Sequence, residues 1–441
     1  MDTATSDTRA ERLVVIGGGQ AATQLIEVAR QKGFEGTITL VSDEPVLPYQ
    51  RPPLSKQYLT GRYGPDWLLY RPERFYEKFA VVVQLGRRAA EIDRATATVR
   101  LDDGTRLCYD KLALTTGARS RPLTVPGIDH PHVFYLRTLA DVDGLRARLN
   151  TTRRVVIVGA GFIGLEAAAV LVQTGVDVTL LAAGDRVIPR IVDGEMASFL
   201  LDHHLLHGVN VIMRTTVAAL RDLGDGNVAV VLEDGRSYQA DMVLIGVGAV
   251  ANVELAEAAG LLCSNGIVVD ELARTSDPAI VAAGDCTNHP NGLVGRRLRL
   301  ETVHNAVEQG RTAGATIAGQ ELPYIQSPWV WSDQYKLRLQ SVGVSEGYDR
   351  TVMRGKPADG RFSLFYYRGN ELLAVNCINQ PLIFGAVRRL LNERIPLHPD
   401  EAADTGFDLT RPLPRTTTLE FDIPWRTKFE KQQLALAWGF E

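Results

Sequence analysis

The residues of this chain that are best placed for chemistry are the small residues Gly17, Gly19 and Ala22. They follow the hydrophobic run 13–16, which is typical of a buried parallel strand, and they precede a helical pattern. In this spacing the first glycine permits a tight turn and the second lets backbone approach a pyrophosphate. The third small residue lets the helix pack close to the strand. The start of the helix then offers free N–H groups and the positive end of its dipole to the phosphates.

The same pattern occurs a second time, at Gly159, Gly161 and Gly164, again after a hydrophobic run. Both copies continue into a second apolar strand, at 38–41 and at 178–181. One copy alone would indicate only that a dinucleotide binds. Two βαβ units of similar length in one chain indicate two nucleotides, which predicts a flavin carrier together with a nicotinamide donor.

Composition bounds the class of protein. The 441 residues are enough for about three domains, and 45% hydrophobic with 23% charged residues is typical of a globular protein. A net charge of -4 predicts no nucleic-acid partner. Four cysteines without CxxC or metal-ligand spacing predict reduced thiols, no metal site and a cytoplasmic protein. No signal-peptide core and no apolar run of about 20 residues is present, so no membrane association is expected.

Charged residues follow the first unit. Asp43 and Glu44 lie just past the second strand, where a carboxylate would accept hydrogen bonds from an adenosine ribose. Asp43 is preferred to Glu44 for this role, and a solvated turn charge is the alternative. In the stretch 48–59, two prolines stiffen the chain and would hold Arg51 and Lys56 beside the phosphates and the flavin. A cation there stabilises the reduced ring. Solvated charges on a proline-capped surface helix are an equal alternative.

Three later positions also point to the flavin. Thr116 and Gly117 end a strand where backbone can meet a cofactor, and Asp285 follows Gly284 at another strand end. Because a buried aspartate needs hydrogen-bond donors, Asp285 is a candidate for a flavin ribitol hydroxyl. The helical pattern at 301–319 would point its N-terminus at the flavin pyrimidine and help to carry negative charge there.

A carboxylate also lies close to the second glycine pattern. Glu166 is two residues past Gly164, so it faces the nucleotide crevice and is a candidate for holding the nicotinamide end. An exposed first-turn glutamate, favoured only by the helix dipole, is the alternative.

These motifs together resemble a known family. Over about residues 12–395 the chain resembles the FAD-dependent pyridine nucleotide-disulfide oxidoreductases, in the ferredoxin reductase branch. That branch includes putidaredoxin and rubredoxin reductases, dioxygenase reductase components and apoptosis-inducing factor. Besides the two glycine patterns, the resemblance is carried by RPPLSK (51–56), TTGAR (115–119), GFIGLE (161–166), AAGDC (282–286), ETVHNAVEQGR (301–311) and WSDQY (331–335).

The resemblance implies an α/β fold with two Rossmann-like domains of glutathione-reductase type and a C-terminal α+β domain. The FAD domain would comprise residues 1–119 and 249–326. An NAD(P)H domain, 120–248, would be inserted between them, and residues 327–441 would form the C-terminal domain with an extended tail.

The resemblance also implies the roles of individual residues. The lysine matching Lys56 and the glutamate matching Glu166 pair beside the isoalloxazine, and the tryptophan matching Trp331 lies by the cofactor, near the route to an iron–sulfur partner. Thr302 and Val303 would begin the helix under the flavin. The implied FAD contacts are Gly17, Gly19, Ala22, Asp43, Arg51, Lys56, Thr116, Gly117, Arg119, Gly284, Asp285, Thr302, Val303 and Trp331. The implied NAD(P)H contacts are Gly159, Gly161, Gly164, Glu166, Arg186 and Arg190.

The expected activity is transfer of a hydride from NADH or NADPH to FAD and of single electrons to a [2Fe–2S] ferredoxin. The ferredoxin would serve a cytochrome P450 or a ring-hydroxylating oxygenase. Electrons must leave singly because no CxxC accepts them as a pair, and flavin divides a two-electron donation into single steps. The alternatives are an NADH oxidase or monodehydroascorbate reductase-like enzyme, and a signalling flavoprotein like apoptosis-inducing factor.

The partner would be acidic, because ferredoxins typically are, so a basic docking surface is expected. The alternative is that these charges are only solvated. Separately, the protein is expected to be a monomer or homodimer. The candidates are Arg296, Arg297, Arg299, Lys336 and Arg338, with Arg388 and Arg389 in addition.

Two features depart from the family pattern. Ala182 stands at the strand end where a carboxylate usually binds the ribose 2′-hydroxyl, and Arg186 and Arg190 lie nearby. The hypothesis is a relaxed preference for NADH, with use of NADPH. The second departure is the tail beyond about residue 412, which is expected to pack on the protein because its residues 421–438 include several large apolar side chains.

Overall fold

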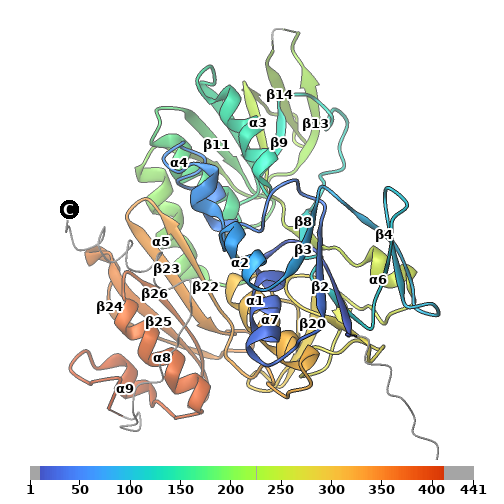
Figure 1. The fold of residues 1–441 in the computed structure, drawn as a ribbon. Helices are drawn as coiled ribbons and strands as arrows, with labels where there is room; N and C mark the ends of the chain where they lie inside the picture. Colours follow the sequence, from blue (N-terminus) through green and yellow to red (C-terminus); the bar gives the residue numbers. More distant parts are fainter. Residues whose placement is uncertain (1–9, 225, 412–441) are drawn as a thin grey trace, which may run out of the picture.

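Two parallel sheets form the centre of the molecule, as the two glycine patterns predict (Figure 1). The computed structural model describes residues 10–224 and 226–411. The first sheet has the spatial order β19 (Ile280–Ala282), β7 (Lys111–Leu114), β1 (Arg12–Ile16), β2 (Thr37–Ser42) and β3 (Val81–Leu85). The second has the order β12 (Asn210–Ile212), β11 (Asp177–Leu181), β10 (Arg154–Val158), β16 (Met242–Ile245) and β9 (Val133–Tyr135).

Each unit places one helix after its glycine pattern, so both predicted βαβ units are confirmed. The helices are α1 (Gln20–Gln31) and α4 (Phe162–Val172). Ala22, the third small residue of the first pattern, is completely buried. A larger side chain there would push α1 away from its sheet.

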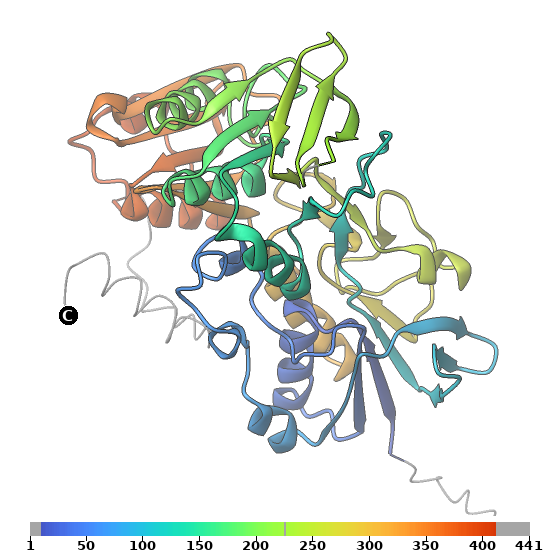
Figure 2. The same ribbon diagram turned by 90° about the horizontal axis from the view of Figure 1, so that it is seen from above.

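Helix α1 is also covered from the other side, by α7 (Val303–Ile317), and the two helices lie side by side in Figures 1 and 2. Glycines in α7 make this close crossing possible. A Cβ at Gly310 would lie 2.7 Å from the backbone oxygen of Ala21, and one at Gly314 would lie 2.5 Å from that of Leu25.

The C-terminal region is an antiparallel sheet with helices, which confirms the predicted α+β arrangement. The strand order is β22 (Trp329–Gln334), β23 (Leu337–Gly343), β26 (Glu371–Ile378), β25 (Arg361–Arg368) and β24 (Arg350–Lys356). Helix α8 (Pro381–Glu393) packs on β23 and β26, and α9 (Pro399–Ala403) packs on β24.

Smaller elements connect these parts. Strands β8 (Ala118–Ser120) and β17 (Ala249–Ala251) pair where the chain passes to the second unit and where it returns. The three-stranded sheets are β4 (Ala89–Asp93), β5 (Thr98–Leu101) and β6 (Arg106–Cys108); β13 (Val217–Asp222), β14 (Val228–Leu232) and β15 (Ser237–Ala240); and β18 (Ile267–Val268), β20 (Thr287–Asn291) and β21 (Arg296–Leu298). The remaining helices are α2 (Glu73–Lys78), α3 (Leu139–Leu149), α5 (Gly194–Leu206) and α6 (Glu254–Ala258), with one-turn 3₁₀ helices at Pro52–Ser55, Pro65–Leu68 and Pro357–Asp359.

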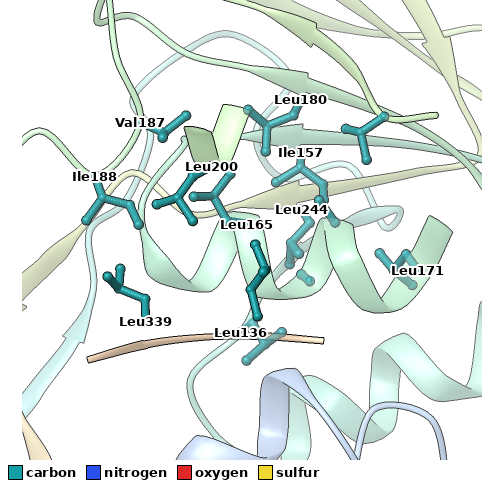
Figure 3. Packing of buried hydrophobic residues seen from close by; sticks show 14 of the residues in the cluster. Leu136, Ile157, Leu165, Leu171, Leu180, Val187, Ile188, Leu200, Leu244 and Leu339 are labelled. Atoms are coloured by element: carbon teal, nitrogen blue, oxygen red, sulfur yellow. The ribbon is translucent and has the colours of Figure 1, made fainter. Parts of the chain in front are cut away.

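One hydrophobic cluster joins the second unit to the C-terminal sheet. It includes Leu165 of α4, Leu180 of β11 and Leu339 of β23, all buried (Figure 3). Burial of apolar surface of this kind is the main attraction between packed layers. The C-terminal sheet is therefore fixed beside the second unit, as Figure 2 shows.

Two further expectations concern membrane-spanning helices and the C-terminal tail. Within residues 10–224 and 226–411 no helix is long and apolar enough to cross a membrane. The predicted packing of the apolar tail, 421–438, lies outside the described residues.

Candidate functional site

Both glycine patterns adopt the geometry that a dinucleotide requires. A Cβ at Gly17 or Gly159 would lie 2.3 or 2.2 Å from a backbone oxygen, and one at Gly164 would lie 2.0 Å from the oxygen of Gly159. Gly19 and Gly161, in contrast, have no atom within 4 Å of that position. The backbone is therefore close-packed behind each turn and open in front of each helix N-terminus, where a pyrophosphate binds. The residues present fit FAD and NAD(P)H.

Glu166 is the point where three parts of the fold meet. The side chain is almost completely buried, with 4% of its surface exposed. Ser55 Oγ and Lys56 Nζ each lie 2.6 Å from its Oε2, and Ser332 Oγ lies 2.7 Å from its Oε1. The expected Lys56–Glu166 pair is therefore formed. The two alternative interpretations, an exposed first-turn glutamate at position 166 and a solvated charge at Lys56, are therefore wrong.

The three donors come from two separate segments of the chain. Ser55 and Lys56 are held by the 3₁₀ helix at Pro52–Ser55, whose two prolines fix the backbone. Ser332 is in the middle of β22, and β22 packs against α4, which carries Glu166. The first unit, the second unit and the C-terminal sheet must therefore all be in place before the carboxylate has its partners.

A hydrogen-bonded chain continues from Ser332 to helix α5. Gln334 Nε2 donates to Ser332 Oγ over 3.2 Å, and Gln334 Oε1 lies 2.9 Å from Nε2 of His204. Burial lowers the pKa of His204 to about 4, so the imidazole is neutral at pH 7. With Nε2 donating, Nδ1 accepts from the Tyr335 hydroxyl at 3.0 Å. Every donor in the chain then points toward Glu166.

The two acids after β2 differ in their partners. Arg51 Nη2 lies 2.6 Å from Glu44, and the Tyr49 hydroxyl donates to the other oxygen of Glu44. Asp43 is exposed and has no hydrogen-bond partner among the described residues. Only Asp43 therefore keeps a free carboxylate at the strand end, which agrees with ranking it first for the ribose.

Asp285 has a partner that the sequence did not suggest. Arg137 Nη2 lies 2.8 Å from Asp285 Oδ2, and the same guanidinium donates to the backbone oxygen of Ala118. The backbone oxygen of Arg137 in turn accepts from Arg51 at 2.7 Å. Arg137 thus connects the predicted residues Arg51 and Asp285, although nothing in its local sequence marks it.

The turn at 115–119 is tied to the strand on which the chain returns. Thr116 Oγ1 donates to the backbone oxygen of Asn252 over 2.7 Å, and the Asn252 side chain donates back to Thr116 at 2.8 Å. The backbone N–H of Asn252 donates to Gly117, and Arg119 is bound by Asn252 and Glu254. Asn252, which the sequence did not single out, therefore fixes this whole turn.

Helix α7 begins beside the strand end of the first sheet. Thr302 caps the helix by accepting from the N–H of Asn305 over 3.1 Å, and Val303 is its first residue. Gly284 is bound to the same helix, because its N–H donates to Gln309 at 2.8 Å. Burial lowers the pKa of His304 to about 4, so the positive charge at this helix start comes from the N–H groups alone.

Trp331 belongs to a row of aromatic side chains at the start of β22. Its ring centroid is 5.5 Å from that of Trp329, which is 5.5 Å from Phe384 of α8. The guanidinium of Arg388 lies 5.9 Å from both the Trp329 and Phe384 ring centroids. The row connects the partly buried Trp331 to a basic residue of α8.

Two of the five leading docking candidates lie at opposite ends of the β22–β23 hairpin. Arg296 pairs with Glu346, close to where Trp329 faces Val342. Lys336 lies in the turn at the opposite end of the β22–β23 hairpin, about 20 Å away at the usual rise of a strand. Arg296 and Lys336 therefore lie at opposite ends of this hairpin, and a docking surface made by the five residues stays a prediction. Arg297 donates to backbone oxygens, Arg299 pairs with Glu301, and Arg338 pairs with Asp333.

The two arginines predicted for the nicotinamide nucleotide lie in the loop after β11. Arg186 and Arg190 are exposed. Within the part of the chain that the structure describes, neither guanidinium has a hydrogen-bond or ion-pair partner.

Comparisons with known proteins agree with this arrangement. Residues 11–310 match the family model described as pyridine nucleotide-disulphide oxidoreductase, and residues 329–413 match the reductase C-terminal model. Rhodocoxin reductase of Rhodococcus erythropolis is 42% identical over 91% of this chain and 94% of its own length.

Two solved structures share the fold. The ferredoxin reductase for the CYP199A2 system from Rhodopseudomonas palustris has a TM-score of 0.88 at 39% identity, covering 91% of this chain and 99% of its own. The covalent putidaredoxin reductase–putidaredoxin complex also has a TM-score of 0.88, at 38% identity, covering 91% and 98%. The chain belongs to the pyridine nucleotide-disulphide oxidoreductase family and carries the reductase C-terminal domain of that family.

Proposed function

We propose that this protein is an NAD(P)H-dependent ferredoxin reductase with FAD as its resident cofactor. The observation that carries the proposal is the buried Lys56–Glu166 pair between two dinucleotide-binding units. When bound, FAD accepts a hydride and gives up its electrons one at a time. The terminal acceptor would be a [2Fe–2S] protein serving a cytochrome P450 or a ring-hydroxylating oxygenase.

The residues of the first unit would hold FAD. The open N-terminus of α1 would receive the pyrophosphate, and Asp43 would accept from the ribose. Arg137 leaves one oxygen of Asp285 free to accept from a ribitol hydroxyl. The backbone N–H groups at the start of α7, capped by Thr302, would favour negative charge on the flavin.

Lys56 and Glu166 would orient the reactants rather than transfer protons. Glu166 is held by three donors, so its position changes little as substrates come and go. It in turn fixes the Lys56 ammonium as a positive charge in the interior. Hydride transfer between stacked rings requires position and a dry site more than an acid or base.

The division of the chain into domains supports this scheme. We infer FAD-binding segments at 1–119 and 249–326, a nicotinamide-nucleotide domain at 120–248 and a C-terminal domain from 327. Strand β8 lies where the chain leaves the first unit and β17 lies where it returns. Their pairing supports the boundaries at 119/120 and 248/249.

The electron-transfer partner would dock at the aromatic row. Trp331, Trp329 and Phe384 lead from the interior to Arg388, and Arg389 is adjacent on α8. Leu382, which is 87% exposed, gives the same helix an apolar contact. Basic and apolar residues together suit an acidic iron–sulfur protein.

A related assignment, an NADH peroxidase, lacks its reactive residue. A peroxidase would need a reactive cysteine near residues 45–60, and that stretch has no cysteine. The four cysteines lie elsewhere, two of them buried.

Anaerobic titration followed by turnover tests the proposal. Under anaerobic conditions NADH or NADPH should rapidly bleach the flavin absorbance. A [2Fe–2S] ferredoxin added afterwards should then be reduced over many turnovers. Arg388→Gln should raise KM for the ferredoxin about tenfold, with a smaller effect at high salt, and leave flavin reduction unchanged. Arg361→Gln, an exposed arginine at the start of β25, is the matched control. Rapid flavin reduction without any ferredoxin turnover would favour an oxidase or a signalling flavoprotein.

A further inference from the structure

The carboxyl end of β11 has no acidic side chain. Ala182 follows the strand and is 4% exposed, held by a hydrogen bond from its N–H to Ile212 and one from the N–H of Thr215. In dinucleotide-binding units a carboxylate at this place binds the ribose 2′-hydroxyl and repels a 2′-phosphate. A nucleotide bound to this unit would meet no negative charge from that position.

The loop that follows is rigidly anchored. Val187 and Ile188 are 0% and 4% exposed and lie in the hydrophobic cluster with Leu180 (Figure 3). The N–H of Ile188 also donates to Ala160, inside the second glycine pattern, over 3.0 Å. The backbone on either side of these anchors is therefore fixed against the nucleotide turn, while Arg186 and Arg190 remain exposed and unpaired in the described part of the chain.

A third arginine reaches the same loop from β12. Arg214 is in the left-handed region with φ of +54°, and its N–H donates to the backbone oxygen of Gly184 over 3.0 Å. Residues with a Cβ rarely adopt this conformation. Its side chain is exposed, and the described residues supply no partner for the guanidinium. Residues held in sparsely populated backbone conformations cluster at functional sites.

We propose that Arg186, Arg190 and Arg214 form a subsite for the 2′-phosphate of NADPH, with Arg214 as its specificity-determining residue. This proposal rests on the function proposed above and names its hydride donor. Guanidinium groups bind phosphate through paired N–H donors. Asp185 lies in the same loop, and the N–H of Glu233 donates to Thr216, next to Thr215 after Arg214, so carboxylates as well as arginines belong to this region.

Calorimetric binding of two adenosine nucleotides tests the subsite without requiring turnover. The full FAD-loaded protein should bind adenosine 2′,5′-bisphosphate at least about tenfold more tightly than 5′-AMP. Arg214→Gly removes the guanidinium and still permits positive φ, so it should abolish most of this preference without weakening 5′-AMP. Arg214→Lys should retain part of it. Ala182→Glu should reverse it, by repelling the 2′-phosphate.

Arg221→Ala is the matched control, because Arg221 is an exposed arginine of the same unit near the far end of β13. It should change neither affinity. Equal binding of the two nucleotides to the unmodified protein would overturn the proposal, as would an equal loss of both in Arg214→Gly.

The same samples separate this inference from the proposed function. If NADH reduces the flavin and ferredoxin turns over while the 2′-phosphate has no effect on affinity, only the subsite is wrong. If the 2′-phosphate preference is present but no nicotinamide nucleotide reduces the flavin, the subsite stands and the reductase function does not.

Discussion

At the scale of single residues, the buried carboxylate of Glu166 has a large energetic consequence. Removing a charge from water costs several kcal/mol, and this cost is offset only when the charge is paired and hydrogen-bonded. Lys56 supplies the opposite charge, and Ser55 and Ser332 supply two further donors. Removing one partner is therefore more damaging than replacing the whole group.

Lys56→Met should lower the free energy of unfolding by about 3–5 kcal/mol, because Glu166 is left as a buried charge without its cation. The double variant Lys56→Met with Glu166→Gln should recover part of that loss, since the uncompensated charge is gone. Chemical denaturation of the four proteins of this cycle measures both effects. A double variant as unstable as the sum of the two single variants would contradict the buried pair.

Ser332→Ala should cost about 1–3 kcal/mol, because Glu166 Oε1 loses its donor without gaining water. The same change should slow flavin reduction by the nicotinamide nucleotide and leave the affinity for 5′-AMP intact, since Glu166 is no longer fixed from the C-terminal sheet. Stopped-flow reduction and denaturation midpoints measure the two effects. Ser341→Ala, at a buried serine of the neighbouring strand β23, is the control and should leave the reduction rate unchanged.

At the scale of elements, the crossing of α1 and α7 positions the flavin side of the site. Both helices start at the carboxyl edge of the first sheet, one after the first glycine pattern and the other after Thr302. Their backbones approach so closely that glycine is required in α7. The two helix N-termini therefore cannot move apart independently.

Gly314→Ala should destabilise the protein by about 1–3 kcal/mol, because its Cβ would lie 2.5 Å from a backbone oxygen of α1. Gly385→Ala in α8 is the matched control, since no atom lies within 4 Å of its Cβ position. That change should stabilise by about 0.4–1 kcal/mol through the unfolded chain. Thermal unfolding gives the sign of each change. A stabilising Gly314→Ala would show that the helices are farther apart than described.

At the scale of the whole molecule, three buried histidines couple the fold to pH. His204 of α5 lies against β22, whereas His289 of β20 and His304 at the start of α7 both contact the ring of Tyr324. Burial lowers the pKa of each to about 4. The folded protein therefore keeps all three neutral under conditions where the unfolded chain protonates them.

The free energy of unfolding should be highest above about pH 6.5 and should fall as the pH drops toward 4. In that window only the unfolded chain binds protons at these histidines. Each histidine contributes about 3 kcal/mol of this loss at pH 4. His289→Phe preserves the stacking on Tyr324 and removes one titrating group, so its stability should fall less steeply. Denaturation midpoints between pH 7 and 4 measure the slopes. An unchanged slope in His289→Phe would exclude His289 from the effect.

Much of the fold followed from local patterns in the chain. The two glycine patterns and their hydrophobic strands predicted both βαβ units, and α7 was predicted from its helical periodicity. Resemblance to the family supplied the Lys56–Glu166 pair. Ser55 and Ser332 were missed although they lie inside the motifs RPPLSK and WSDQY, next to Lys56 and Trp331.

Tertiary structure alone decided which residues meet. Ser332 is 166 positions from Glu166, and Arg137 is 148 positions from Asp285, so no local periodicity connects them. The tertiary structure also placed Arg296 and Lys336 at opposite ends of a hairpin and brought Arg214 to the loop of Arg186. Sequence determined the elements and the turns, because backbone preference and apolar periodicity act over a few residues. The composition of the site depended on packing, because hydrogen bonds between distant segments form only after the layers are in contact.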